Sequence, residues 1–230
     1  NQKKLSEFYE ELKRLNINII RPDINKCNAS FSSNGKDFLY ALGAIKNVGY
    51  EAISNVVDER IKNGEFKSIN DFIKRVNPKD INKLQLEGLV KAGAFDNLNI
   101  NRQTLFNSIP NIILKSKNNF ENNQINQIDL FKEDTEISEN FLEKFDEWNN
   151  DLKLSKEFET LGFFISDHPI NQYKSLFNQY NIVNFENFEK NENILSSNIA
   201  CTVLKIQEKK TQKGNSYAIV KFSDLSSVFE

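Results

Sequence analysis

A long polar stretch, KSKNNFENNQINQIDLFKEDTEISENF, most constrains how this chain of 230 residues can fold. It consists mainly of Asn, Lys, Glu and Gln, so it has too little apolar area to offset the entropy lost on ordering. We expect a flexible linker over residues 115–137. The chain length allows one to three small domains, and such a linker would separate them.

The linker nevertheless carries an apolar pair, Leu130-Phe131, with Gln127 three residues before the leucine. Full burial of such side chains is worth about 1.5–3 kcal/mol each, and none of this is gained in water. One interpretation is a short linear motif that docks into a pocket on a partner. The other is that the pair folds back onto the core of this chain, and the motif alone leaves both open.

The charge of the chain is unevenly distributed, although its formal net charge is only −2. Residues 1–110 hold 17 Lys and Arg against 13 Asp and Glu, whereas residues 111–197 hold 8 against 16. Residues 198–230 are again mildly basic, with 5 against 3. A polyanion is therefore expected to meet the two ends of the chain, and the acidic middle should face protein or water.

Several classes of protein are excluded by what the sequence lacks. It has no apolar run of 18 residues and no secretory signal, so neither a membrane protein nor a secreted one is expected. Cys27 and Cys201 stand alone, which fits a reducing cytoplasm, and the single His168 leaves too few ligands for zinc. The chain starts without Met and ends within an apparent strand, so we expect a piece of a longer protein.

Short strands precede a helical region over residues 41–110. The pattern predicts a strand at 17–20, and a turn at 33–36 between two further strands. Ser68 and Asn101 occupy positions typical of helix N-caps. The region is therefore expected to consist of short helices joined by tight turns.

One of these turns, Ile45-Lys46-Asn47-Val48-Gly49, has the chemistry of a phosphate-binding loop. A tight turn that opens a helix exposes backbone N–H groups, which bind phosphate oxygens without reading bases, and Lys46 adds a cation. The turn resembles the helix-hairpin-helix motif, except that the motif usually has Gly where Asn47 stands. Asn tolerates positive φ better than most residues do. The alternative is an ordinary connection between two helices.

A second turn of the same kind follows in LVKAGAFD, around Ala92 and Gly93, with Arg102 opening the next helix. Two such units in tandem favour a platform that binds a nucleic-acid backbone. We expect Ala92, Gly93 and Arg102 to contact phosphates there, as Lys46, Asn47, Val48 and Gly49 do in the first unit.

Residues 138–180 return to a helical pattern, with an apolar face that includes Leu154 and Ile165 and a stop at Pro169. Ser166, Asp167 and His168 stand close together there. A catalytic triad is rejected because no nucleophile-elbow glycines accompany them. We expect Ser166 and His168 to satisfy terminal backbone groups instead.

The last part of the chain changes to β-branched strands around a polar turn at 211–215. Basic residues beside an aromatic strand face fit an OB-type barrel that stacks single-stranded bases. Its candidate contacts are Lys209, Lys210, Lys213 and Tyr217. The alternative is that the aromatic residues are core and the lysines are solvated.

The chain carries no set of carboxylates placed as in a two-metal nucleotidyl-transfer site, and no Gly-rich phosphate loop. We therefore expect no catalytic residue, no metal site and no cofactor in this segment.

Seven motifs occur in one order: RPDIN, FLYALGAIKNVG, FKSINDFIKRV, LVKAGAFD with NR, QIDLF, ETLGFFISDHPI and TQKGNSYAIVKFSD. In this order they resemble the C-terminal half of the alpha-subunit family of the bacterial replicative DNA polymerase III. KAGAFD and LGFFISDHP are the most specific of them, and the resemblance covers nearly the whole chain.

The resemblance implies an α+β, mostly helical architecture in five parts. These are the end of a fingers domain (1–40), a tandem helix-hairpin-helix domain (41–114), the linker (115–137), a helical connector (138–197) and the start of an OB-type barrel (198–230). The family's catalytic aspartates and their Mg²⁺ ions belong to a palm domain absent from this chain.

The resemblance also implies partners. Gln127, Asp129, Leu130 and Phe131 match the family's motif for the sliding clamp, which makes docking the better interpretation of the apolar pair. Double-stranded DNA, single-stranded template and other replicase subunits are the remaining partners, with no membrane. Two other readings stay open: a non-catalytic DNA-binding scaffold from repair or recombination, and an error-prone homologue of the polymerase.

Overall fold

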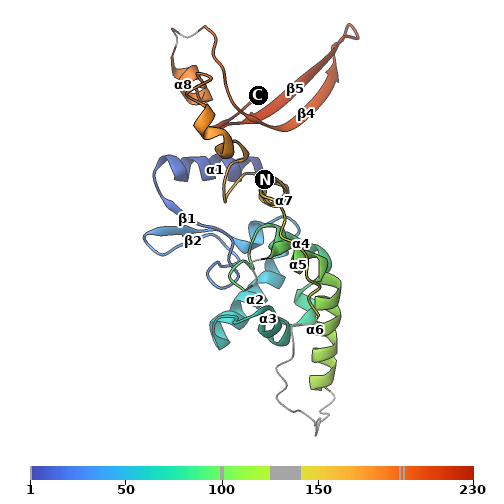
Figure 1. Ribbon diagram of the computed structural model, residues 1–230. Helices are drawn as coiled ribbons and strands as arrows, with labels where there is room; N and C mark the ends of the chain where they lie inside the picture. Colours follow the sequence, from blue (N-terminus) through green and yellow to red (C-terminus); the bar gives the residue numbers. More distant parts are fainter. Residues whose placement is uncertain (1, 99–100, 125–140, 192, 194) are drawn as a thin grey trace. The chain divides into compact units, whose positions relative to one another are not determined.

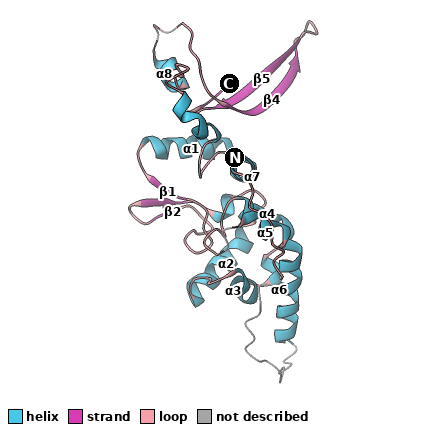
Figure 2. Cartoon of the chain, viewed as in Figure 1, coloured by secondary structure: helices cyan, strands magenta, loops and turns pink. Residues whose placement is uncertain are grey.

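The computed structural model describes residues 2–98, 101–124, 141–191, 193 and 195–230. The chain forms two compact units, residues 1–165 and residues 166–230. The first unit is mainly helical with a small sheet, and the second combines short helical segments with an antiparallel sheet (Figures 1 and 2). The predicted α+β, mostly helical class is therefore confirmed.

The helices of the first unit are short and pack around one apolar core (Figure 1). Two of its helical segments are 3₁₀ turns, η1 and η2. In chain order the helical segments are α1 (Gln2–Arg14), η1 (Leu42–Ala44), α2 (Tyr50–Asn63), α3 (Ile69–Arg75), η2 (Pro78–Asp80), α4 (Lys83–Lys91), α5 (Arg102–Asn107), α6 (Ile109–Gln124) and α7 (Asn150–Leu161).

A three-stranded sheet in the order β1-β3-β2 connects α1 to the helical region. β1 (Asn18–Ile20) runs parallel to β3 (Asp37–Leu39), and β2 (Ser32–Ser33) pairs antiparallel with β3. The strand and the turn predicted here are confirmed. Ile24, Cys27 and Tyr40 are buried in the same core as the helices that follow, so residues 1–40 do not form a separate body.

Side-chain caps begin most of the helices, as local sequence signals predict. The Ser68 side chain accepts a hydrogen bond from the amide of Asp71, and the Asn101 side chain accepts one from Thr104. Both caps were predicted from the sequence and are confirmed. Asn82 and Asn149 cap α4 and α7 in the same way, so the abundant Asn has a structural task at helix starts.

Two helix ends differ from the prediction. α6 continues to Gln124, so the stretch 115–124, predicted as linker, is helical. Its Asn-rich sequence is supported by tertiary contacts, because Ser116 is buried and the ammonium of Lys115 lies 3.9 Å from the centre of the Phe141 ring. α7 ends at Leu161 rather than near Pro169, because Gly162 adopts a left-handed C-cap with φ of 87°.

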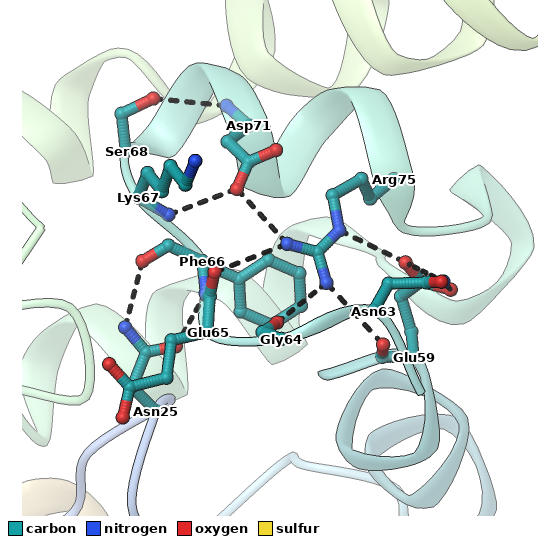
Figure 3. Close-up of polar contacts among 10 residues, drawn as sticks. All are labelled: Asn25, Glu59, Asn63, Gly64, Glu65, Phe66, Lys67, Ser68, Asp71 and Arg75. Carbon is teal, nitrogen blue, oxygen red and sulfur yellow. Dashed lines mark hydrogen bonds and ion pairs between the residues drawn. The ribbon is translucent and has the colours of Figure 1, made fainter. Parts of the chain in front are cut away.

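A single arginine locks the connection between α2 and α3 (Figure 3). The guanidinium of Arg75 bonds to the carboxylates of Glu59 and Asp71 at 3.0 and 3.1 Å and to the carbonyl of Gly64 at 2.8 Å. It also lies 4.5 Å from the centre of the Phe66 ring. The planar fork of arginine can serve all these partners at once, whereas an ammonium cannot.

The second unit begins with η3 (Pro169–Leu176) and α8 (Phe185–Lys190) and continues into a sheet of order β4-β5-β6. β4 (Thr202–Lys210) and β5 (Ser216–Ser223) form a long hairpin, and β6 (Val228–Phe229) pairs with β5 (Figure 2). The predicted turn is present, with the amide of Thr211 bonded to the carbonyl of Asn215. Closure into an OB-type barrel stays a prediction.

Replacing Arg75 by Lys should lower the free energy of unfolding by about 1–3 kcal/mol, because bonds to two carboxylates and a carbonyl would be lost. Chemical denaturation measures the change. Arg14→Lys is the matched control, since the ion pair of Arg14 with Glu11 is exposed and should contribute less than about 1 kcal/mol. Equal effects of the two substitutions would contradict this role of Arg75.

Candidate nucleic-acid interface

The first hairpin turn, residues 45–49, lies between η1 and α2, so a 3₁₀ turn precedes it and an α-helix follows it. Asn47 adopts φ of 68°, a left-handed conformation that glycine adopts most readily. The departure from the helix-hairpin-helix pattern at this position is therefore accommodated by the backbone tolerance of Asn.

Backbone donors open α2 without a side-chain cap. Gly49 is the N-cap residue and has no side chain to accept from the first turn of the helix. The first helical bond of α2 runs from the amide of Ile53 to the carbonyl of Gly49. By helix geometry the amides of Tyr50, Glu51 and Ala52 have no acceptor within the helix. This end of α2 therefore presents N–H groups and the positive end of the helix dipole.

In the first hairpin turn, some backbone amides are bonded within the protein, whereas some side chains are exposed. Val48 is buried, and its amide bonds to the carbonyl of Ile45 at 3.1 Å. The amide of Lys46 bonds to the carbonyl of Thr160 on α7, also at 3.1 Å. These two amides are engaged within the protein, although the sequence suggested Val48 as a donor to phosphate. The side chains of Lys46 and Asn47 are exposed.

α4 packs directly onto the first hairpin turn through a glycine. A Cβ placed on Gly88 would lie 2.6 Å from the carbonyl oxygen of Lys46 and 3.4 Å from the Val48 side chain. Any larger residue would push the helix and the turn apart. The turn is thus held by α4 on one side and by the Thr160 carbonyl of α7 through its backbone.

The second turn packs against a buried arginine. Gly93 has φ of 80°, and a Cβ on it would lie 2.2 Å from Nη2 of Arg102. Arg102 is only 3% exposed, and Ala92 is buried as well. Ala92, Gly93 and Arg102 are thus mostly buried, and their predicted contacts with phosphate stay a prediction.

Arg102 forms ion pairs with two carboxylates. Its guanidinium lies 2.6 Å from Asp96 and 2.8 Å from Glu157, and Glu157 is fully buried. Burial disfavours the charged guanidinium, but the hydrogen bonds and charges of Asp96 and Glu157 outweigh it and raise the pKa of Arg102. The structural role of Glu157 was not predicted from the sequence. Its partner Arg102 lies 55 residues earlier, and no local sequence signal connects the two.

The tip of the β4–β5 hairpin gathers the residues predicted to meet single strands. Lys209 lies directly opposite Tyr217 in the register, and the Tyr217 side chain is 44% exposed. Lys210 and Lys213 are exposed too, but the strand alternation places Lys210 on the opposite face from Lys209. Lys205 and Lys221, also paired across the strands, share the face of Lys209 and Tyr217.

His168 has the structural task that the sequence suggested. Its Nδ1 accepts a hydrogen bond from the amide of Ile170 at the start of η3, and its Nε2 lies 3.0 Å from the hydroxyl of Ser223. It therefore caps the beginning of η3, where the sequence had suggested the end of the preceding helix.

Other predicted sites are not described. Gln127, Asp129, Leu130 and Phe131 lie outside the described residues. Within the part of the chain that the structure describes, no group of three or more His, Cys, Asp and Glu side chains could hold a metal ion. In the same residues, no helix is both long enough and apolar enough to cross a membrane.

Comparison with known proteins places this geometry in a family. The model of the helix-hairpin-helix motif matches residues 16–105. This range includes the first hairpin turn, Gly88 and Gly93. The DNA polymerase III subunit alpha of Borreliella burgdorferi is 34% identical over 96% of the chain, and that of Campylobacter jejuni is 37% identical over 85%. The Caulobacter vibrioides subunit is 32% identical over the whole chain.

The chain is related to the DNA polymerase III alpha subunits. It spans only about a fifth of the length of these relatives. The resemblance drawn from seven short motifs is thereby confirmed, together with a helix-hairpin-helix region that fits DNA binding.

Replacing Arg102 by Met should lower the free energy of unfolding by about 3–5 kcal/mol, because Glu157 would stay buried without its cation. Denaturation monitored by circular dichroism measures the loss. The exposed Arg14→Met serves as control and should cost less than about 1 kcal/mol. A stable Arg102→Met variant with weakened DNA binding would instead support the predicted contact of Arg102 with phosphate.

Proposed function

We propose that this chain is the DNA-holding segment of a replicative DNA polymerase, in which the first hairpin turn binds the phosphate backbone of duplex DNA. The observation that carries the proposal is the uncapped start of α2 behind a turn with Asn47 at positive φ. The amides of Tyr50, Glu51 and Ala52 and the ammonium of Lys46 would bind phosphate oxygens without contacting bases.

The parent protein would catalyse template-directed nucleotidyl transfer from dNTPs, with two Mg²⁺ ions held in another part of it. This segment contributes no catalytic residue to that reaction. Its task is to keep duplex DNA in place, together with other replicase subunits, in the cytoplasm. The relatives named as polymerase subunits favour this over a repair scaffold.

Substitutions at Asn47 test the phosphate role. Because phosphate contacts release counterions, the affinity for a short duplex should fall steeply with salt, with a log–log slope of about −0.9 per phosphate. Asn47→Gly keeps the turn, since glycine adopts positive φ readily, and should change the affinity less than about twofold. Asn47→Val should strain the turn by roughly 1–3 kcal/mol and weaken binding.

Fluorescence anisotropy with a labelled duplex at several salt concentrations measures both effects, and a denaturation curve reports the strain. Binding that is insensitive to salt would refute the phosphate role. Equal affinities of the Gly and Val variants would show that the conformation of Asn47 is irrelevant to it.

The clamp motif adds a second contact to the proposal. Leu130 and Phe131 would enter an apolar pocket of the sliding clamp, with Gln127 and Asp129 at its rim. A peptide of this size should bind with a Kd in the micromolar range, about −8 kcal/mol. Attachment to a DNA-bound polymerase raises the effective concentration, so a weak contact can give a durable complex.

A Leu130→Ala, Phe131→Ala double variant should lose measurable clamp binding while its denaturation curve stays unchanged. The loss follows from removing the two side chains that would be buried in the clamp. Surface plasmon resonance on immobilised clamp measures it. Clamp affinity equal to that of the parent chain would eliminate this motif as the contact.

The β4–β5 hairpin is a candidate for single-stranded template. Tyr217 offers an exposed ring on which a base can stack, and Lys209 directly opposite offers a cation to the backbone. The paired Lys205 and Lys221 repel each other across the strands, and a polyanion would relieve this repulsion.

A further inference from the structure

Two lysines form ion pairs with one carboxylate close to the first hairpin turn. The Nζ atom of Lys91 on α4 lies 2.9 Å from Oε1 of Glu159, and Nζ of Lys156 on α7 lies 3.7 Å from Oε2. The charge of Lys46 in the turn also acts on this carboxylate. Helix α7 reaches the turn itself, because the carbonyl of Thr160 accepts the amide of Lys46.

The cluster differs in burial from one member to the next. The Lys91 side chain is 11% exposed, and its ammonium also lies 5.5 Å from the centre of the Phe106 ring, so its position is fixed. The Glu159 side chain is 48% exposed and that of Lys156 is 30% exposed. A partly exposed carboxylate therefore lies between a nearly buried cation, Lys91, and a partly exposed one, Lys156.

The carboxylate is ionised at neutral pH. The hydrogen bond from Lys91, together with the charges of Lys91, Lys156 and Lys46, holds the pKa of Glu159 below its ordinary value, although burial opposes this. The four side chains then carry a net charge of about +2, and removal of the carboxylate alone would raise it to about +3.

We propose that Glu159 is an electrostatic brake on DNA binding, whose carboxylate competes with a backbone phosphate for Lys91 and Lys156. This inference rests on the proposed phosphate role of the first hairpin turn and concerns its regulation. The pair of Lys156 with Glu159 is partly exposed and contributes little to stability, so an arriving phosphate can replace the carboxylate there without loss of fold. The competition lowers affinity for the duplex and lets the backbone move past the turn during synthesis.

The pair of Arg102 and Glu157 differs from the ion pairs of Glu159 in its burial. Both of its side chains are almost fully buried, at 4% and 0% exposure. Glu159, two residues further along α7, is the acidic residue whose ion pairs can open toward solvent. The proposal thus assigns structure to one glutamate of α7 and regulation to the other.

The test is duplex binding by the 230-residue chain with Glu159→Gln, which keeps the shape of the side chain and removes its charge. We expect roughly tenfold tighter binding at low salt. The magnitude of the log–log salt slope should increase by about 0.9–1.8, which corresponds to one or two additional phosphates. Lys156→Met should weaken binding less than about twofold in the parent chain and severalfold in the Glu159→Gln background.

Glu11→Gln is the matched control, since it removes the same charge and releases Arg14 from an exposed ion pair on α1. Equal tightening by both substitutions would overturn the proposal in favour of a general charge effect. Unchanged affinity of Glu159→Gln, with salt-dependent binding by the parent chain, would overturn the brake and leave the phosphate role intact. Absence of salt-dependent binding in the parent chain would overturn both.

Discussion

The close approach of α4 to the first hairpin turn is the contact on which the candidate interface depends. Gly88 allows it, because a Cβ at that position would lie 2.6 Å from the carbonyl oxygen of Lys46. From another direction the carbonyl of Thr160 accepts the amide of Lys46. Two elements far apart in sequence thus fix one short turn, and its conformation does not depend on the turn residues alone. A turn held in this way fixes the start of α2, so the proposed phosphate contact there would need no further ordering.

Ion pairs of two arginines connect the helices around the first hairpin turn. Arg102 joins the region after α4 to α7 through Asp96 and Glu157, and this brings α7 to the turn. Arg75 ties the end of α2 to α3 in a comparable way. The pair of Arg102 with Glu157 would be costly to break, because removal of Arg102 leaves the charge of Glu157 buried. The exposed Lys46 stays available to a polyanion.

Sequence reasoning succeeded where the signal was local. The caps at Ser68 and Asn101 and the positive φ tolerated at Asn47 depend on one residue and its neighbours, and the structure contains all three. It failed where distant residues decide. The Asn-rich end of α6 is helical because Ser116 and Lys115 pack against other elements. Arg102 looked like a phosphate ligand because its partner Glu157 lies 55 residues away.

Backbone amides at the start of α2 are proposed to hold the DNA. Titration of a short duplex into the ¹⁵N-labelled chain, followed by NMR of the amide signals, tests this most directly. The amides of Gly49, Tyr50, Glu51 and Ala52 should shift at duplex concentrations that leave the buried amides around Gly93 and Arg102 unchanged. Large shifts around Gly93 and Arg102, with the start of α2 unaffected, would contradict the account.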